Sequence, residues 1–319
     1  MLNSLYGRHC LTLQDFTAEE IRTILDLAAK LKEKQRRGET HPLLPGKTLA
    51  MIFQKPSTRT RVSFEVGMWQ LGGSALFLSS QELQMGRGEP VKDTAAVLSR
   101  YVDGIMIRTF DQREVEELAA FASVPVINGL TDLLHPCQVL ADLLTVEEKT
   151  GCLKGIKLAY LGDGNNVAHS LMIGCSKMGL DIAIATPHHY RPSSQIEEKA
   201  RANALESGSR IMVTSDPLEA VKNARVIYTD VWASMGQEEE KQARRAIFGP
   251  YQVNERIVDA AAPEVLVMHC LPAYRGEEIT AGVLESECSI VLDQAENRLH
   301  AQKGLMALLM GKTFRKDEK

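Results

Sequence analysis

The chain has 319 residues and a mass of 35.3 kDa, with 44% hydrophobic residues, 24% charged residues and a formal net charge of -4. This composition is typical of a globular chain with about two domains and excludes a disordered protein. The slightly acidic balance disfavours a nucleic-acid-binding protein, because such proteins usually carry a strong basic excess.

The sequence also lacks the features of an exported or membrane protein. Its six cysteines are scattered without Cys-x-x-Cys spacing, which indicates free thiols in a reducing compartment. The N-terminal residues contain no apolar run of signal-peptide length, and no stretch approaches the roughly 18 apolar residues of a membrane span. We therefore expect a cytoplasmic protein with no membrane partner and no nucleic-acid partner.

The first predicted helix begins with a capping pattern. Thr17 and Glu20 are spaced so that the side chain of each can bond to the backbone amide of the other. The pattern predicts a helix that runs to about Arg36. The lysines and arginines near its end indicate a solvated C-terminus, favoured by the helix dipole, rather than a basic binding patch.

Short apolar runs then alternate with helical patterns in two series. The first series predicts strands over Thr48–Phe53, Ser74–Leu78, Gly104–Arg108 and Val124–Ile127. A long helix is expected from about Pro136 to Lys149. The second series predicts strands over Lys157–Leu161, Asp181–Ala185, Arg210–Val213, Val226–Thr229, Val265–His269 and Ile290–Leu292. A last helix is expected from about Gln294 to Met310.

These strands are apolar and β-branched on both faces, as in a parallel sheet covered by helices. Their alternation with helices predicts an α/β fold with two doubly wound parallel-sheet domains joined by long helices. We expect a first domain over residues 1–150 and a second over residues 151–293, with the C-terminal helical segment 294–319 packing back on the first. Ligands of such sheets bind outside the carboxyl ends of strands, so the loops after the strands are the expected sites.

The loop after the first strand has the composition of an anion site. It reads Gln-Lys-Pro-Ser-Thr-Arg-Thr-Arg and leads into a helical pattern. Hydroxyls and free amides at a helix N-terminus suit an anion, and Arg59 and Arg61 add bidentate donors. A helix start normally favours acids, so two arginines there favour a bound anion over a serine cap with surface arginines. The P-loop pattern is absent, which disfavours nucleotide hydrolysis.

Donor side chains follow the third and fourth strands. Arg108 ends the third strand, and His135-Pro136-Cys137-Gln138 opens the long helix after the fourth. Arginine, histidine and glutamine are donors suited to a carbonyl oxygen that becomes negative during attack. Taken alone, His135 fits a helix-capping or core histidine slightly better. A metal site with Cys137 is disfavoured, because the sequence has no second close pair of ligands to complete it.

The second series carries three further motifs. Gly162-Asp163-Gly164 resembles half of a dinucleotide fingerprint, but Val167 replaces the third glycine, which favours a tight turn where Asn166 can hold a small polar group. Asp230 lies just past a strand end and can pair with a substrate ammonium or cap the next helix. Cys270 follows His269, but adjacent residues of an extended segment point to opposite faces. His269 therefore cannot easily act as a base for that thiol, which disfavours a cysteine–histidine hydrolase.

The order and separation of these motifs resemble the aspartate/ornithine carbamoyltransferase family over nearly the whole chain. The motifs are Ser57-Thr58-Arg59-Thr60-Arg61, Arg108, His135-Pro136-Cys137-Gln138, Asp230-x3-Ser234-Met235-Gly236 and His269-Cys270-Leu271-Pro272. The first and third motifs mark the wider family. The Ser-Met-Gly loop and the His-Cys-Leu-Pro segment mark its ornithine-specific branch.

The resemblance implies transfer of the carbamoyl group of carbamoyl phosphate to the δ-amine of L-ornithine, giving L-citrulline and phosphate in arginine metabolism, with no cofactor and no metal. It implies that carbamoyl phosphate is held by Ser57, Thr58, Arg59, Thr60, Gln84, Arg108, His135, Gln138, Cys270, Leu271 and Arg298. It implies that ornithine is held by Asn166, Asp230, Ser234 and Met235. It assigns direct catalytic roles to Arg108, His135, Gln138, Asp230 and Cys270.

The resemblance also implies a homotrimer or an assembly of trimers with shared active sites, in which the loop carrying Gln84 serves a neighbouring subunit. The nearest alternative is a sister carbamoyltransferase that uses putrescine, an acetylated ornithine or aspartate. The Asp230–Gly236 loop disfavours it, because that loop provides for a free α-amino acid, and Leu83–Val91 lacks a match to the loop lysine of the aspartate branch. More remote alternatives are a nucleotide-dependent oxidoreductase and a non-enzymatic amino-acid-binding regulator.

Overall fold

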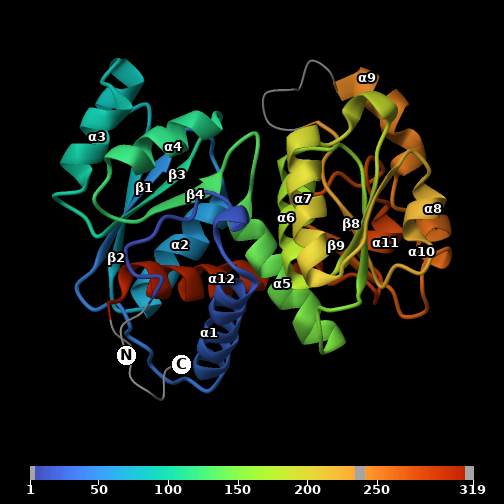
Figure 1. Cartoon of the computed structure of the whole chain (residues 1–319), viewed down its shortest axis with the longest axis horizontal. Helices are drawn as coiled ribbons and strands as arrows, with labels where there is room; N and C mark the ends of the chain where they lie inside the picture. Colours follow the sequence, from blue (N-terminus) through green and yellow to red (C-terminus); the bar gives the residue numbers. More distant parts are fainter. Residues whose placement is uncertain (1–3, 234–240, 313–319) are drawn as a thin grey trace. The chain divides into compact units, whose positions relative to one another are not determined.

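The computed structural model describes residues 4–233 and 241–312. The chain divides into two compact units (Figure 1). Unit 1 comprises Met1–Leu144 and Glu296–Lys319, and unit 2 comprises Thr145–Ala295. Within the described ranges, no helix is long and apolar enough to cross a membrane.

Unit 1 contains a four-stranded parallel sheet with the strand order β2-β1-β3-β4. Its strands are β1 (Thr48–Phe53), β2 (Ser74–Ser79), β3 (Gly104–Arg108) and β4 (Val126–Leu130). Its helices are α1 (Ala18–Arg36), α2 (Thr58–Gln70), α3 (Val91–Leu98), α4 (Gln112–Phe121), most of α5 (Pro136–Thr150), most of α12 (Val291–Met310) and the short turns η1 (Leu13–Asp15) and η2 (Gln84–Arg87). From β1 the chain adds β2 on one side and then returns to add β3 and β4 on the other side. The direction of winding therefore reverses between β1 and β3.

Helices cover both faces of this sheet (Figure 1). One face packs its β1 and β3 side chains, including Ile52 and Ile105, against Val115 and Leu118 of α4 and against residues of α3. On the other face lie α2 and α12. Helix α12 also approaches α1 closely, because a Cβ atom built on Gly304 would lie 2.8 Å from the carbonyl oxygen of Ile24. The segment of α12 that carries Arg298 is therefore held by packing on two other helices of unit 1.

Strand β4 differs from the predicted strand Val124–Ile127, which was wrong at both ends. Asn128-Gly129 has the composition of a turn, so the local sequence predicts an earlier end. In the structure the segment around Cys10 pairs with the strand: the Cys10 amide donates to the Val126 carbonyl, and the Asn128 amide donates to the Cys10 carbonyl, each at 2.8 Å. This pairing, distant in sequence, keeps the chain extended where its composition favours a turn.

A bulge in β4 lies beside Arg108. The register between β3 and β4 shifts between Ile107 and Arg108, which leaves Gly129 as the extra residue. A Cβ atom built on Gly129 would lie 2.6 Å from the sulfur of Met106 and 3.1 Å from the Ile107 carbonyl oxygen. Since bulges re-aim neighbouring side chains, this glycine contributes to the placement of Arg108.

Replacing Gly129 by alanine is therefore expected to lower the free energy of unfolding by about 1–3 kcal/mol, the usual cost of overpacking a buried site. Urea unfolding of the wild type and the variant measures this difference. Gly249→Ala is a suitable control, because a Cβ atom there meets nothing within 4 Å and the backbone φ is not positive. Equal losses in the two variants would contradict a specific requirement for glycine in the bulge.

Unit 2 contains a five-stranded parallel sheet with the order β7-β6-β5-β8-β9. Its strands are β5 (Lys157–Leu161), β6 (Asp181–Ala185), β7 (Ile211–Thr214), β8 (Val226–Thr229) and β9 (Leu266–His269). Its helices are α6 (Asn166–Met178), α7 (Ser194–Ser207), α8 (Pro217–Val221), α9 (Lys241–Phe248), α10 (Glu255–Asp259) and α11 (Ala281–Leu284), with the turns η3 (His188–Tyr190) and η5 (Gly249–Tyr251). Here the winding reverses between β5 and β8.

The predicted α/β class with two doubly wound parallel sheets is confirmed. The predicted strand Ile290–Leu292 was wrong, because α12 begins at Val291. An isolated bridge between Ser289 and Val267 comes before the helix: the Val267 amide donates to the Cys288 carbonyl at 2.8 Å, and the Ile290 amide donates to the Val267 carbonyl at 2.9 Å. Leu292 is 77% exposed, which suits a helix surface and not a buried strand. An apolar β-branched run alone does not separate a strand from a helix start.

A buried lysine ties α12 to its neighbours. Lys303 is fully buried, and its Nζ donates to Oε1 of Gln35 at 2.7 Å and to Oε1 of Gln70 at 2.8 Å. Nε2 of His41 lies 3.1 Å away. Burial lowers the pKa of Lys303 to about 8. These contacts connect the helix that carries Arg298 to α1 and to the end of α2.

The lowered pKa predicts a specific pH dependence of stability. Between pH 8 and pH 10 the folded state releases the Lys303 proton while the unfolded state retains it, so the free energy of unfolding rises with pH by at most about 1.4 kcal/mol per unit. Urea unfolding across this range should show a smaller rise for Lys303→Met than for the wild type. Lys30→Met, a change at an exposed lysine of α1, is the control. Parallel curves for the wild type and Lys303→Met would contradict the assignment.

Candidate active site

Polar side chains gather where each sheet reverses its winding. In unit 1 they follow β1 and β3, and in unit 2 they follow β5 and β8. Ligands of open parallel sheets bind outside the carboxyl ends of the strands at such a reversal. Each unit therefore presents one cluster where a small molecule is expected.

The loop after β1 ends in a capped helix. Ser57 is the N-cap of α2, and its Oγ accepts from the Thr60 amide at 3.2 Å and donates to Thr60 Oγ1 at 3.1 Å. Thr58, Arg59 and Thr60 form the first turn, in which Thr58 is exposed and Arg59 is half-buried. The predicted anion site thus has the expected local structure, a helix N-terminus with hydroxyls and an arginine.

Arg298 joins this loop to the start of α5. It is buried on α12, and its Nη2 donates to Thr60 Oγ1 at 3.2 Å while its Nη1 donates to Gln138 Oε1 at 2.7 Å. The structure therefore brings together Ser57, Thr60, Gln138 and Arg298, which are widely separated in sequence. Gln84 lies exposed in η2, and within the described ranges the structure does not join it to this cluster.

Arg108 and His135 are buried in the same unit, Arg108 as the last residue of β3 and His135 directly before α5. Burial, and then the positive charges of Arg298 and Arg108, hold the pKa of His135 well below its usual range. The imidazole is therefore neutral at physiological pH and carries a single N–H donor. Together with Arg108 it can hydrogen-bond to a carbonyl oxygen without adding a second full charge.

Cys137, in the same motif, has a structural role. It is fully buried, and its Sγ donates to the Asn128 carbonyl at 3.4 Å. Burial raises the pKa of its thiol to about 12. A thiol of this kind is neither a ready nucleophile nor a ready metal ligand.

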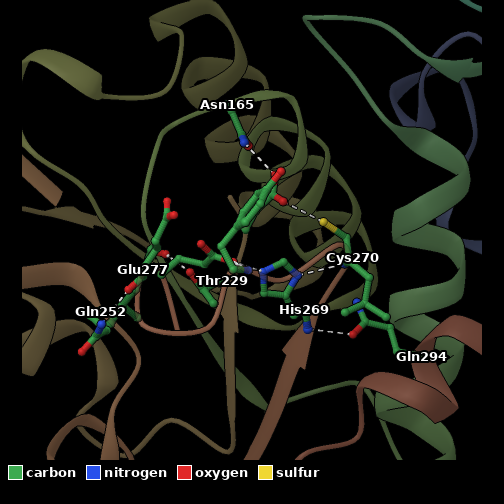
Figure 2. A network of polar contacts seen from close by, with 12 residues as sticks. Asn165, Thr229, Gln252, His269, Cys270, Glu277 and Gln294 are labelled. Atoms are coloured by element: carbon green, nitrogen blue, oxygen red, sulfur yellow. Dashed lines mark hydrogen bonds and ion pairs between the residues drawn. The ribbon is translucent and has the colours of Figure 1, made fainter. Parts of the chain in front are cut away.

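In unit 2, Asp230 is the centre of the cluster. It follows β8, is only 6% exposed, and accepts from Cys270 Sγ at 2.9 Å through Oδ1 and from Asn165 Nδ2 at 2.8 Å through Oδ2. Figure 2 shows these contacts, with Asn165 and Cys270 labelled. Two predicted residues, Asp230 and Cys270, therefore meet here from the ends of β8 and β9.

Asn165 is a site residue that sequence reasoning missed. It caps α6, with Oδ1 accepting from the amides of Val167 at 3.0 Å and Ala168 at 3.2 Å. This leaves Nδ2 to bond Asp230. The predicted Asn166 is the first residue of α6. Asparagine is preferred at the N-cap position of a helix, and this preference is the signal that would have indicated Asn165 in place of Asn166.

His269 holds the segment after β9 and does not act on the thiol of Cys270. Its Nδ1 accepts from the Leu271 amide at 2.9 Å, and its Nε2 lies 3.0 Å from Oε1 of the buried Glu278. Its own amide donates to Gln294 Oε1 at 2.9 Å (Figure 2). Leu271 has a positive φ of 59°, a conformation that this network supports.

Asp230, His269 and Cys270 each place one potential metal ligand within 4.8 Å of the others. Both ring nitrogens of His269 are already engaged, with the Leu271 amide and with Glu278. The donor set therefore does not fit a metal ion. The predicted ornithine-binding residues Ser234 and Met235 lie outside the described residues.

One unit of this α/β protein has a helix start with hydroxyls and an arginine, and the other has a buried carboxylate after a strand. Two family models match the chain: the carbamoyl-P binding domain of aspartate/ornithine carbamoyltransferase over residues 8–148, and its Asp/Orn binding domain over residues 154–309. The chain belongs to the aspartate/ornithine carbamoyltransferase family, which confirms the resemblance seen in the sequence.

Similar proteins match over their full length. A Pyrococcus furiosus protein named "Ornithine carbamoyltransferase, anabolic" is 60% identical over 311 residues, covering 98% of this chain and 99% of that protein. The ornithine carbamoyltransferase of Bacillus subtilis is 59% identical over 309 residues, covering 97% and 96%. A solved structure of the ornithine carbamoyltransferase from Pyrococcus furiosus matches with a TM-score of 0.95 at 60% identity, covering 98% and 99% of the two chains.

Proposed function

We propose that this protein transfers the carbamoyl group of carbamoyl phosphate to the δ-amine of L-ornithine and releases L-citrulline and phosphate. The observation that carries the proposal is the contact between Asp230 and Cys270 just beyond the ends of β8 and β9 in unit 2. A buried carboxylate there suits the ammonium group of an amino acid. The full-length identity of about 60% to proteins named for ornithine supports the same substrate.

The proposal assigns one substrate to each unit. Residues 1–150 with the segment 294–319 form the carbamoyl-phosphate-binding domain, and residues 151–293 form the ornithine-binding domain. The phosphate is held by the first turn of α2 and by two arginines, that is by Ser57, Thr58, Arg59, Thr60, Arg108 and Arg298. The capping of α2 by Ser57 and the Arg298–Thr60 hydrogen bond support this arrangement.

In the proposed mechanism the neutral δ-amine attacks the carbamoyl carbon directly. Arg108 and the neutral His135 hydrogen-bond to the carbonyl oxygen as it becomes an oxyanion, while Gln138 orients the carbamoyl group. The C–O bond to phosphate then breaks, and the phosphate can accept the proton that leaves the amine. Catalysis rests mainly on positioning and on preorganised charge, and it requires no covalent intermediate.

The proposed ornithine site uses residues from three loops of unit 2. Asp230 binds the α-ammonium group, with Asn165 fixing the carboxylate through its Nδ2. Asn166, Ser234 and Met235 help to bind the α-amino and α-carboxylate groups of ornithine. Cys270 and Leu271 lie beside the reacting amine and carbon. The positive φ of Leu271 supports this role, because such backbone conformations cluster at functional sites.

We also propose a homotrimer or an assembly of trimers, in which Gln84 completes the site of a neighbouring subunit. Exposed apolar side chains on α2 and on the edge strand β2 support an assembly: Trp69 is 75% exposed, and Val62, Leu76 and Phe77 are also exposed. An edge strand with large apolar residues needs a covering partner. A cytoplasmic location and a role in arginine biosynthesis complete the proposal, in line with the anabolic relative.

The test is citrulline formation from carbamoyl phosphate and L-ornithine by the purified protein, with putrescine, N-acetylornithine and aspartate as parallel acceptors. Turnover with ornithine and not with the others is expected. Turnover with another amine would retain the carbamoyl-phosphate site and overturn the assignment of unit 2. No turnover with any amine, in protein that binds carbamoyl phosphate by calorimetry, would overturn the proposed reaction.

A further inference from the structure

Helix α5 carries a buried acid that the mechanism above does not use. Asp142 is only 1% exposed and lies one helical turn after Gln138, which is equally buried. Its neighbours in the helix, Ala141 and Leu143, are buried apolar residues. Burying a carboxylate among apolar side chains costs free energy unless hydrogen bonds compensate, so its partner is informative.

One partner is the side-chain amide of Gln138, which donates from Nε2 to Asp142 Oδ1 at 2.8 Å. The Oδ1 atom accepts this hydrogen bond, so it pairs with the NH2 end of the amide. The other end, Oε1, is thereby directed to Arg298, whose Nη1 donates to it at 2.7 Å. Arg298 can only donate, so it favours the same orientation, and Asp142 adds a second constraint at the other end of the Gln138 amide.

The same chain of contacts reaches the anion-binding loop. Arg298 also donates from Nη2 to Thr60 Oγ1 at 3.2 Å, and Thr60 accepts from Ser57 Oγ at 3.1 Å. All these residues belong to unit 1. Asp142 is therefore connected, through Gln138 and Arg298, to Thr60 in the first turn of α2.

We propose that Asp142 is a positioning residue for carbamoyl transfer: it fixes the amide orientation of Gln138 and, through it, the guanidinium of Arg298. The inference rests on the proposed function of this site and names no new substrate. Asp142 itself touches neither substrate. Its effect on the site is transmitted through the hydrogen bond to Gln138.

The test is the variant Asp142→Asn, which keeps the shape of the side chain but can donate as well as accept. We expect kcat/KM for carbamoyl phosphate to fall roughly tenfold to a hundredfold, as for other small misplacements of catalytic groups, with the KM for ornithine nearly unchanged. In a Gln138→Ala background, Asp142→Asn should cause no further loss, because neighbours that act through one contact are not additive. Asp142→Glu keeps an acceptor-only carboxylate and should retain more activity than Asp142→Asn.

Three results would overturn the inference: wild-type kinetics in Asp142→Asn, independent additive losses in the double variant, or a lower activity for Asp142→Glu than for Asp142→Asn. Cys137→Ala is the matched control, because this buried neighbour on the same helix faces the Asn128 carbonyl instead. Wild-type protein in the same assay separates the two proposals. If the wild type makes no citrulline, the proposed function fails. The positioning role is then tested by calorimetric binding of carbamoyl phosphate to the wild type and to Asp142→Asn. Equal affinities would overturn it.

Discussion

Replacing Arg108 by methionine is expected to lower kcat for citrulline formation by about 10²- to 10³-fold, the usual loss when one preorganised oxyanion donor is removed. Arg108 is buried at the end of β3, and methionine approximately fills its volume, so the loss should appear in the chemical step and not in folding. Steady-state kinetics with both substrates varied gives the measurement. The exposed Arg113 on α4 supplies the control variant Arg113→Met.

The same variant has a second readout. The positive charge of Arg108 helps to lower the pKa of His135, so its removal should move that pKa upward, toward the ordinary value. Burial is the larger cause and Arg298 remains, so the recovery should be partial. Titration of the His135 ring by NMR tests this. An unchanged kcat in Arg108→Met, or a His135 pKa that falls, would contradict the assignment of the two residues to one oxyanion site.

Replacing Asp230 by asparagine is expected to raise the KM for ornithine at least about thirtyfold, which corresponds to about 2 kcal/mol for losing one partner of a buried charge pair. The amide keeps the size of the side chain and can still accept from Asn165, so the cluster should remain folded. The KM for carbamoyl phosphate should change little. Initial-rate kinetics with each substrate varied at saturating levels of the other separates the two constants.

Arg59→Ala is the complementary variant to Asp230→Asn. Arg59 lies in the first turn of α2, at the proposed phosphate site, so its loss should raise the KM for carbamoyl phosphate far more than that for ornithine. Asp230→Asn should therefore raise mainly the KM for ornithine, and Arg59→Ala mainly the KM for carbamoyl phosphate. If each raised both constants equally, the division of the substrates between the two units would be wrong.

Local sequence signals predicted most of the framework. Strands β1, β3, β5, β6 and β8 lie where short β-branched runs placed them, because such runs have few alternatives in an α/β chain. The Thr17–Glu20 capping box is present, and Pro136 occupies the first position of α5. These features depend on neighbouring residues only.

The two errors have different causes. Asn128-Gly129 is extended because Cys10, far away in sequence, pairs with β4, and this contact cannot be read from a window of neighbouring residues. Val291 and Leu292 are helical because a short apolar run fits a helix start as well as a strand.

The site shows the same division. Its motifs identified the residues that end strands or open helices, such as Ser57, Arg108, His135 and Asp230. Two residues that contact predicted site residues were not themselves predicted. Asn165, which bonds Asp230, differs from its neighbour Asn166 by its capping position, and Asp142, which bonds Gln138, is a buried acid in the apolar part of α5. That apolar setting is a usable signal, because an acid at a core position of a helix needs a partner.

The close approach of Gly304 to α1 predicts that a substitution outside the candidate site can lower activity. Any side chain at position 304 would press on the Ile24 carbonyl and on Ala28, and α12 would have to move away together with Arg298. A substitution there is expected to lower the rate of citrulline formation, although it lies about two turns of helix from the guanidinium. Substitutions that lower activity in this protein are therefore expected at helix contacts as well as at the candidate site.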